Sequence, residues 1–293
     1  YFGAQAKLKA GDYAIENGAT MRSVLDTLIE GDAILYKVTI PEGWTSLQTV
    51  ERLQATPELT GEIEEVPPEG SLMPDTYRFA RNTPRGDIIA RMQAAQDEFL
   101  EKVWPTRDPD LPIESKEEAL ILASIVEKET GLADERSKVA GVFINRLRQG
   151  MRLQSDPTII YGLVGGRASL GRPIYRSEIL KETPYNTYVI RGLPPTPIAN
   201  PGRAAIEAVL RPAETDALYF VADGTGGHAF AKTLAEHNRN VAEWRKIEAQ
   251  MRAEQQAAAR EAEGSGGIAA MAEEAVPASA AQLPVPLPVR APR

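Results

Sequence analysis

The 293-residue sequence contains no cysteine and only two histidines, His228 and His237. Without cysteine, thiol nucleophiles, disulfide bonds and thiolate zinc sites are excluded. Two histidines in one short region give little basis for a Ser-His-Asp triad or a three-histidine metal site. The sequence also has no cluster of metal ligands and no glycine-rich phosphate loop after a strand. We therefore expect no metal and no nucleotide cofactor.

Long apolar runs and clustered positive charge are missing too. No apolar run approaches the ~18 to 20 residues of a membrane-spanning helix, and no signal-peptide pattern opens the chain. The net charge is -8 and lysine and arginine are nowhere concentrated, which argues against a nucleic-acid partner. With 43% hydrophobic and 25% charged residues, the chain predicts a soluble globular protein of two domains.

Two similar stretches near the N-terminus predict a small module. In each, a threonine, Thr20 or Thr45, precedes apolar residues at helical spacing and is placed to cap a short helix. The segments before them, 12–15 and 34–40, have the composition of strands. We interpret residues 1–60 as an α/β accessory module.

The remainder predicts an α+β fold in which helices and short strands are mixed. Helical periodicity covers 87–104, 116–130 and 133–149, with Gly150 placed to end the last of these. From Met151 onward glycine and proline are frequent and the expected strands are short, at 187–190 and 217–221, which is typical of loops shaped for binding. Another helix is expected from 234 to about 263, and the Ala/Pro-rich tail 264–293 is predicted to be disordered.

One carboxylate interrupts an apolar helical stripe in the middle of the chain. In the 116–130 helix, Ile121, Leu122, Ile125, Val126 and Glu129 fall on one face. Burial raises the pKa of a carboxyl because it disfavours the anion, and such a group can hold a proton near neutral pH. Glu129 is therefore a candidate general acid. The alternative is a helix-end carboxylate paired with lysine or arginine.

Several ordered segments carry unusual side chains and together resemble one family. They are Pro74-Asp75-Thr76-Tyr77, Val126-Glu127-Lys128-Glu129-Thr130, Met151 to Thr158, Pro184-Tyr185-Asn186-Thr187-Tyr188, Gly192 to Gly202, and Val221-Ala222-Asp223-Gly224 with Gly226 to Phe230. This order is similar to that of the YceG-like endolytic murein transglycosylases, the MltG family. The resemblance implies a LysM-like module at 1–60 and a YceG-like catalytic domain over 61–250.

The resemblance also implies the chemistry and the residue that performs it. The family's catalytic position falls on Glu129, as the apolar stripe does, whereas Glu127 lies about 200° around the helix and is expected to be solvated or paired. Glu129 would protonate the glycosidic oxygen and then take the proton of the C6 hydroxyl of N-acetylmuramic acid, which leaves a 1,6-anhydro end. Asp156 is the nearby candidate for a second carboxylate; its alternative role is to cap the turn that it begins.

Five further residues are candidates for substrate binding. The amides of Gln154 and Asn186 suit the N-acetyl and hydroxyl groups of a glycan, and Tyr185 and Tyr188 offer flat faces for a sugar ring. His228, flanked by a glycine in the resembling segment, is expected to line the cleft. For each of them the alternative is a hydrogen-bonded structural role in a loop.

Three functions remain open on the sequence alone. The first is a transglycosylase that cuts within nascent glycan strands and limits their length. The second is a peptidoglycan-binding or cell-wall-synthesis scaffold protein without catalysis, and the third is a muramidase that uses water. The resemblance implies peptidoglycan strands and cell-wall synthases as partners. It also implies a single N-terminal anchor in the bacterial inner membrane, outside this chain, with this portion on the periplasmic side.

Overall fold

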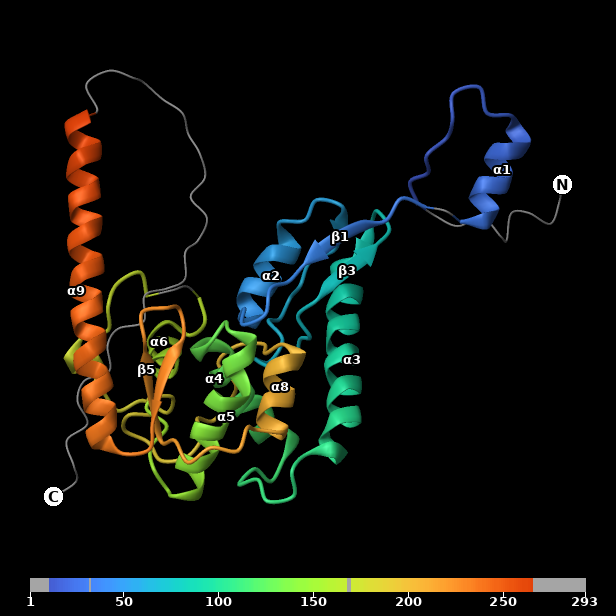
Figure 1. Cartoon of the computed structure of the whole chain (residues 1–293). Coiled ribbons are helices and arrows are strands. Elements are labelled where there is room, and N and C mark those ends of the chain that lie inside the picture. The colour runs from blue at the N-terminus through green and yellow to red at the C-terminus, as the bar shows by residue number, and fades with distance from the viewer. Residues whose placement is uncertain (1–10, 32, 168–169, 266–293) are drawn as a thin grey trace.

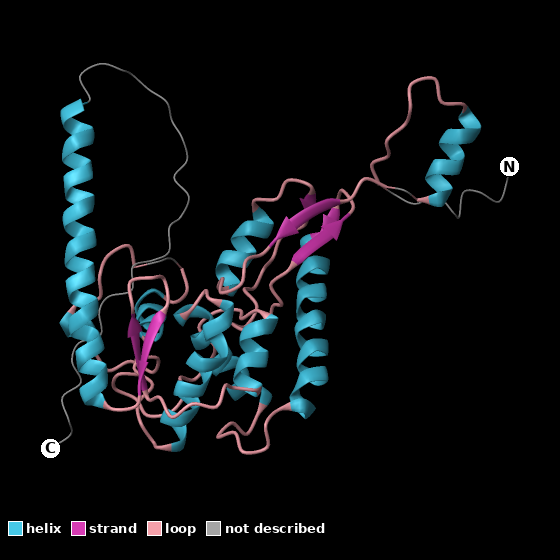
Figure 2. Ribbon diagram, in the orientation of Figure 1, coloured by secondary structure: helices cyan, strands magenta, loops and turns pink. Residues whose placement is uncertain are grey.

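The computed structural model describes residues 11–31, 33–167 and 170–265. These residues form nine α-helices and six short strands, so the fold is mixed and helices dominate it (Figures 1 and 2). The elements in chain order are α1 (Met21–Glu30), β1 (Tyr36–Thr39), α2 (Ser46–Gln54), β2 (Leu59–Thr60), β3 (Thr76–Phe79), β4 (Thr83–Pro84), α3 (Arg85–Val103), a 3₁₀ turn (Trp104–Thr106), α4 (Lys116–Glu129), α5 (Ala133–Arg148), α6 (Asp156–Val164), α7 (Arg176–Ile179), α8 (Arg203–Leu210), β5 (Tyr219–Ala222), β6 (His228–Ala231) and α9 (Leu234–Ser265).

The two predicted threonine caps begin α1 and α2. Thr20 accepts a hydrogen bond from the backbone N–H of Ser23, and Thr45 forms a reciprocal capping box with Gln48. The strand predicted at 12–15 does not form: this segment is irregular, although Ile34 N–H donates to the Asp12 carbonyl. Helix α1 buries none of its residues and stands apart from the rest of the chain (Figure 1).

A small core joins residues from both sides of residue 60. Strand β1 pairs antiparallel with β3, with Tyr36 opposite Phe79, and both strands pack with α2 and α3. The buried members are Val38, Ile40, Leu53, Leu59, Leu72, Tyr77, Phe79, Ile88, Ile89 and Met92. The second strand–helix unit thus has its hydrophobic partners further along the chain. The division at residue 60 stays a prediction.

The larger core lies between α4, α5 and α8. Helix α8, which the sequence pattern did not predict, packs against both other helices (Figure 1). The predicted stripe of α4 is confirmed, since Ile121, Leu122, Ile125 and Val126 are all buried. Helix α5 ends at Arg148, and Gly150 follows with the left-handed φ of +63° that turns the chain toward the next loop.

A β-hairpin and the last helix complete the described chain. Strands β5 and β6 pair antiparallel, with Phe220 opposite Phe230, and α9 packs on both. The helix predicted from 234 is confirmed and continues to Ser265; the predicted tail beyond it, 266–293, lies outside the described residues. Within the described ranges, no helix combines the length and apolar character needed to cross a bilayer.

The strand predicted at 187–190 is wrong, because this segment is a tight turn. The backbone N–H groups of Val189 and Ile190 both donate to the Asn186 carbonyl, and that of Tyr188 donates to the Asn186 side chain. An asparagine side chain that bonds the backbone two residues on favours a turn over a strand. The local pairing outweighs the β propensity of the residues that follow.

Candidate active site

Glu129 is the last residue of α4 and lies inside the protein. Only 8% of the residue is exposed, and the next residue, Thr130, leaves the helix with extended backbone angles. Helix α6 packs against α4, so that Ser155 and Asp156 face the Glu129 carboxyl. The predicted burial of the Glu129 side chain is therefore confirmed.

The surroundings of Glu129 keep it protonated near neutral pH. Burial is the main cause that raises its pKa, to about 7, and the negative charge of Asp156 adds to the rise. The Ser155 hydroxyl and the Arg146 guanidinium lower the pKa of Glu129, but by less. Ser155 is itself buried, and within the described residues its hydroxyl has no partner in strict hydrogen-bond geometry. Glu129 can therefore both donate and accept a proton.

Asp156 is a second buried carboxyl beside the first. It is the first residue of α6, and its Oδ1 accepts a 2.7 Å hydrogen bond from the Tyr188 hydroxyl. Burial raises the pKa of Asp156 to about 6, although the bond from Tyr188 lowers it. The turn-capping role is not what the structure shows, because the turn is closed by Thr158, whose N–H and hydroxyl both donate to the Ser155 carbonyl.

Arg146 is a functional candidate that the sequence reasoning missed. Its guanidinium is buried and donates to the Leu153 carbonyl at 2.5 Å and the Leu218 carbonyl at 2.6 Å. It thereby fixes the loop that carries Ser155 and places positive charge near Glu129. A signal was present: Arg146 follows Val142 and Phe143 at helical spacing, so it interrupts an apolar stripe as Glu129 does.

Gln154 has the backbone geometry of a residue held under strain. Its φ of +53° is in the left-handed region, and its N–H donates to the Thr187 carbonyl at 3.1 Å. Such angles in a non-glycine residue persist where the surrounding structure enforces them, often at functional sites. The side chain is half-buried, and its amide makes no hydrogen bond to any residue that the structure describes. This amide is free to bind a ligand.

The two tyrosines and Asn186 divide into different roles. The Tyr185 ring packs 4.9 Å from the Tyr161 ring and its hydroxyl lies 2.8 Å from the Thr196 hydroxyl. The Tyr188 hydroxyl is engaged by Asp156. Asn186 is 1% exposed and its amide is committed to backbone groups of its own loop. The hydrogen bonds of Asn186 and Tyr188 fit support of the site better than contact with a sugar.

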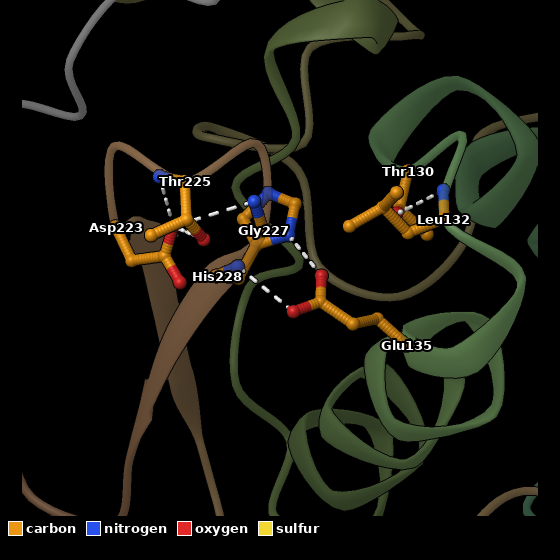
Figure 3. Close-up of polar contacts among 7 residues, drawn as sticks. All are labelled: Thr130, Leu132, Glu135, Asp223, Thr225, Gly227 and His228. Carbon is orange, nitrogen blue, oxygen red and sulfur yellow. Dashed lines mark hydrogen bonds and ion pairs between the residues drawn. The ribbon is translucent and has the colours of Figure 1, made fainter.

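His228 lies at the start of β6 and points toward α5. Figure 3 shows its ring beside the Glu135 carboxylate, which is 2.8 Å from Nδ1 and also accepts the His228 backbone N–H. Asp223 closes the hairpin tip by accepting hydrogen bonds from Thr225 and Gly227 (Figure 3). No contact joins His228 to Glu129 among the described residues. This histidine fastens the hairpin to α5.

The two residues before Glu129 face the opposite side of the helix end. Glu127 accepts a 2.9 Å hydrogen bond from Gly202 N–H and lies 3.9 Å from the Arg136 guanidinium, so it is paired, one of the two predicted states. Lys128 donates to the Gly43 carbonyl at 3.2 Å. The turn at 43–46 is thereby attached to the catalytic helix.

Asn200 binds this turn to the rest of the chain. It is fully buried; its side-chain amide donates to the Trp44 carbonyl and the Ser46 hydroxyl and accepts from Leu72 N–H. Its backbone carbonyl accepts from Gly43 N–H. One side chain thus connects three segments that lie far apart in the sequence.

Glu129 is a buried carboxyl whose pKa is raised to about 7, as suits a group that donates and accepts a proton. The sequence comparisons identify the family: the model of the YceG-like family matches residues 1–243. The chain belongs to the YceG-like family.

Named relatives cover most of the chain. It is 33% identical to an endolytic murein transglycosylase of Streptococcus pneumoniae serotype 2 over 80% of this chain and 50% of the relative. It is 31% identical to an endolytic murein transglycosylase of Bacillus subtilis, over 82% of this chain and 73% of the relative. The chain spans half the length of the pneumococcal relative.

A solved structure is similar as well. The crystal structure of a putative YceG-like protein from Listeria monocytogenes superposes with a TM-score of 0.57 at 32% identity. The match covers 81% of this chain and 87% of the Listeria chain. At this identity the likeness supports both the fold and the family.

Proposed function

We propose that this chain is an endolytic peptidoglycan lytic transglycosylase. It cleaves the bond between N-acetylmuramic acid and N-acetylglucosamine within glycan strands and leaves 1,6-anhydro-N-acetylmuramic acid ends. The observation that carries the proposal is the burial of Glu129 with a pKa of about 7 in a chain whose named relatives are endolytic murein transglycosylases. Only a carboxyl that still holds its proton near neutral pH can protonate a leaving oxygen.

The chemistry needs one carboxyl in two successive states. Glu129 gives its proton to the glycosidic oxygen as the bond to the anomeric carbon breaks. The C6 hydroxyl of the same muramic acid then attacks that carbon, and the Glu129 carboxylate takes the hydroxyl proton. The enzyme returns to its starting protonation state and no water is consumed. Gln154 supplies a free amide for a sugar N-acetyl or hydroxyl group, and Tyr185 remains a candidate platform for a ring.

A water-using muramidase is the second candidate, favoured by one observation. An inverting hydrolase requires a second carboxylate to activate water, and Asp156 faces Glu129. The Asp156 carboxylate accepts the Tyr188 hydroxyl, however, and this occupies one of its oxygens. The two reactions differ in their products, because hydrolysis adds one water to the new end.

Product analysis tests the proposal and separates the candidates. Uncrosslinked glycan strands are incubated with the parent protein and with Glu129→Gln, which keeps the shape of the side chain but has no transferable proton. We expect anhydro ends from the parent by mass spectrometry and a loss of about 10³-fold or more in the variant. Equal digestion by both proteins would show that Glu129 is not the catalytic acid. New reducing ends that carry one added water would indicate a muramidase. Binding without any cleavage by the parent would favour a scaffold protein.

The biological setting follows by analogy with the family and is part of the proposal. The protein acts on nascent strands, limits their length and works beside cell-wall synthases on the periplasmic face of the inner membrane, held by an N-terminal anchor outside this chain. Residues 1–60 form a LysM-like module and 61–250 the catalytic domain.

A further inference from the structure

The loop at 186–188 was expected to touch the sugar, yet its contacts point inward. Asn186 donates to the carbonyls of Ile179 and Lys181 at 3.0 and 2.7 Å and accepts the Tyr188 N–H at 3.0 Å. Both ends of the amide are thus used to fix the backbone of Tyr188. A buried amide satisfied by its own chain stabilises a loop and has little capacity left for a ligand.

Several hydrogen bonds then join this loop to the segment 154–158, which faces Glu129. The Thr187 carbonyl accepts from Gln154 N–H at 3.1 Å, and the Thr187 hydroxyl accepts from Ser155 N–H at 2.9 Å. The same hydroxyl lies 2.9 Å from that of Thr158. At the end of this series the Tyr188 hydroxyl donates to Asp156 at 2.7 Å. The whole arrangement fixes one carboxylate.

The charged and titratable groups around Glu129 come from three elements. Asp156 faces it from α6, Arg146 from α5 and the Tyr188 hydroxyl from the 186–188 loop. Arg146 donates to two backbone carbonyls and forms no ion pair with either carboxylate in the described structure. Burial raises the pKa of both Asp156 and Glu129, and the negative charge of Asp156 opposes ionisation of Glu129.

We propose that Asp156 is a positioning residue for the proton of Glu129, and that Asn186, Thr187 and Tyr188 serve to hold it. The Asp156 carboxylate repels a second negative charge and keeps the proton on Glu129 in the resting site. It acts through Glu129, does not touch the sugar and activates no water. The inference rests on the proposed function of Glu129 as the acid.

The pH dependence of kcat/KM for release of anhydro ends tests this role. In Asp156→Asn the repelling charge is gone, so we expect the basic limb of the profile to move to lower pH by about one unit. In Tyr188→Phe the limb moves the same way by a smaller amount, because Asp156 without its donor is less ionised at a given pH and repels the Glu129 anion less. The control is Asp216→Asn, whose carboxylate pairs with Lys232 at the exposed surface, and its limb stays in place.

The outcomes separate this inference from the proposed function. In both variants the basic limb could stay at the parent position while only the plateau of kcat/KM falls. That result would give Asp156 and Tyr188 a structural role and overturn the inference. If Asp156→Asn does not fold, Tyr188→Phe decides alone. Glu129→Gln in the same series must lose most of the release of anhydro ends; if it releases them at the parent rate, both the proposed function and this inference fail. An inactive Glu129→Gln with unmoved limbs defeats the inference alone.

Discussion

The two faces at the end of α4 each bury a carboxyl but give it different partners. On one face the pKa of Glu127 is raised by burial and by the negative charge of Glu42, while the Gly202 N–H, Arg136 and Lys128 oppose the rise. On the other face Glu129 has only Ser155 and Arg146 in opposition, and Asp156 adds to the rise. Burial raises the pKa of both carboxyls. The Gly202 N–H and Arg136 tie Glu127 into the fold, whereas Glu129 has no ion pair within the described residues.

The contacts of Glu127 and Lys128 also connect the N-terminal part of the chain to the helix that carries Glu129. Lys128 and Glu127 hold the segments at 43 and 202, and Asn200 holds both to Leu72. A change in this network displaces the helix end that carries Glu129. On the Glu129 side the hydrogen bonds hold Ser155 and Asp156, and the raised pKa of Glu129 itself depends mainly on burial.

The substitution Asn200→Ala disrupts the hydrogen bonds on the Glu127 side of α4 and has the largest expected effect on stability. Asn200→Ala leaves the buried Leu72 N–H and Ser46 hydroxyl without this partner, so we expect the free energy of unfolding to fall by about 3 kcal/mol. Urea unfolding measures the change, and release of anhydro ends should fall with it. The control Asn238→Ala, exposed on α9, should stay within about 0.5 kcal/mol of the parent. A loss as small as that of the control would show that the network is dispensable.

The substitution Glu129→Gln tests the other side of the α4 end, and its expected effect on stability is smaller. The pKa of Glu129 is raised from 4.5 to about 7, so the folded state binds more protons than the unfolded state between these values. The contribution of Glu129 to stability is therefore present at low pH and lost as pH rises to 7 and above. Glu129→Gln does not suffer this loss.

We expect the variant to gain stability relative to the parent by on the order of 2 kcal/mol between pH 5 and pH 8. Thermal unfolding at the two pH values measures the gain. Glu98→Gln on the exposed surface of α3 is the control. A stability difference that does not change with pH would mean that Glu129 is already ionised in the folded protein.

Features set by local sequence were predicted well. The caps Thr20 and Thr45, the three helices of the central region and the buried stripe ending in Glu129 need only neighbours within a turn or two. The strand at 187–190 was predicted from β propensity and was wrong, because the hydrogen bonds of Asn186 close a turn there. The segment at 12–15, predicted as a strand, is irregular.

Features set by distant contacts were missed. Helix α8 is short and lies in a region rich in glycine and proline, and its stability comes from packing on α4 and α5. Arg146 was overlooked because its two carbonyl partners, at 153 and 218, are brought together only by the fold. Asn186 and Tyr188 were assigned to the sugar because a sequence does not show that their polar atoms are used within the protein.

The most direct test of the account is a titration of the Glu129 carboxyl itself. Carbon NMR of protein labelled at the glutamate carboxyl carbons, with Glu129→Gln used to assign the signal, gives the midpoint. The account predicts a midpoint of about 7, with the proton retained at pH 6. A midpoint near the ordinary value of 4.5 would contradict it, because Glu129 would then have no proton to give.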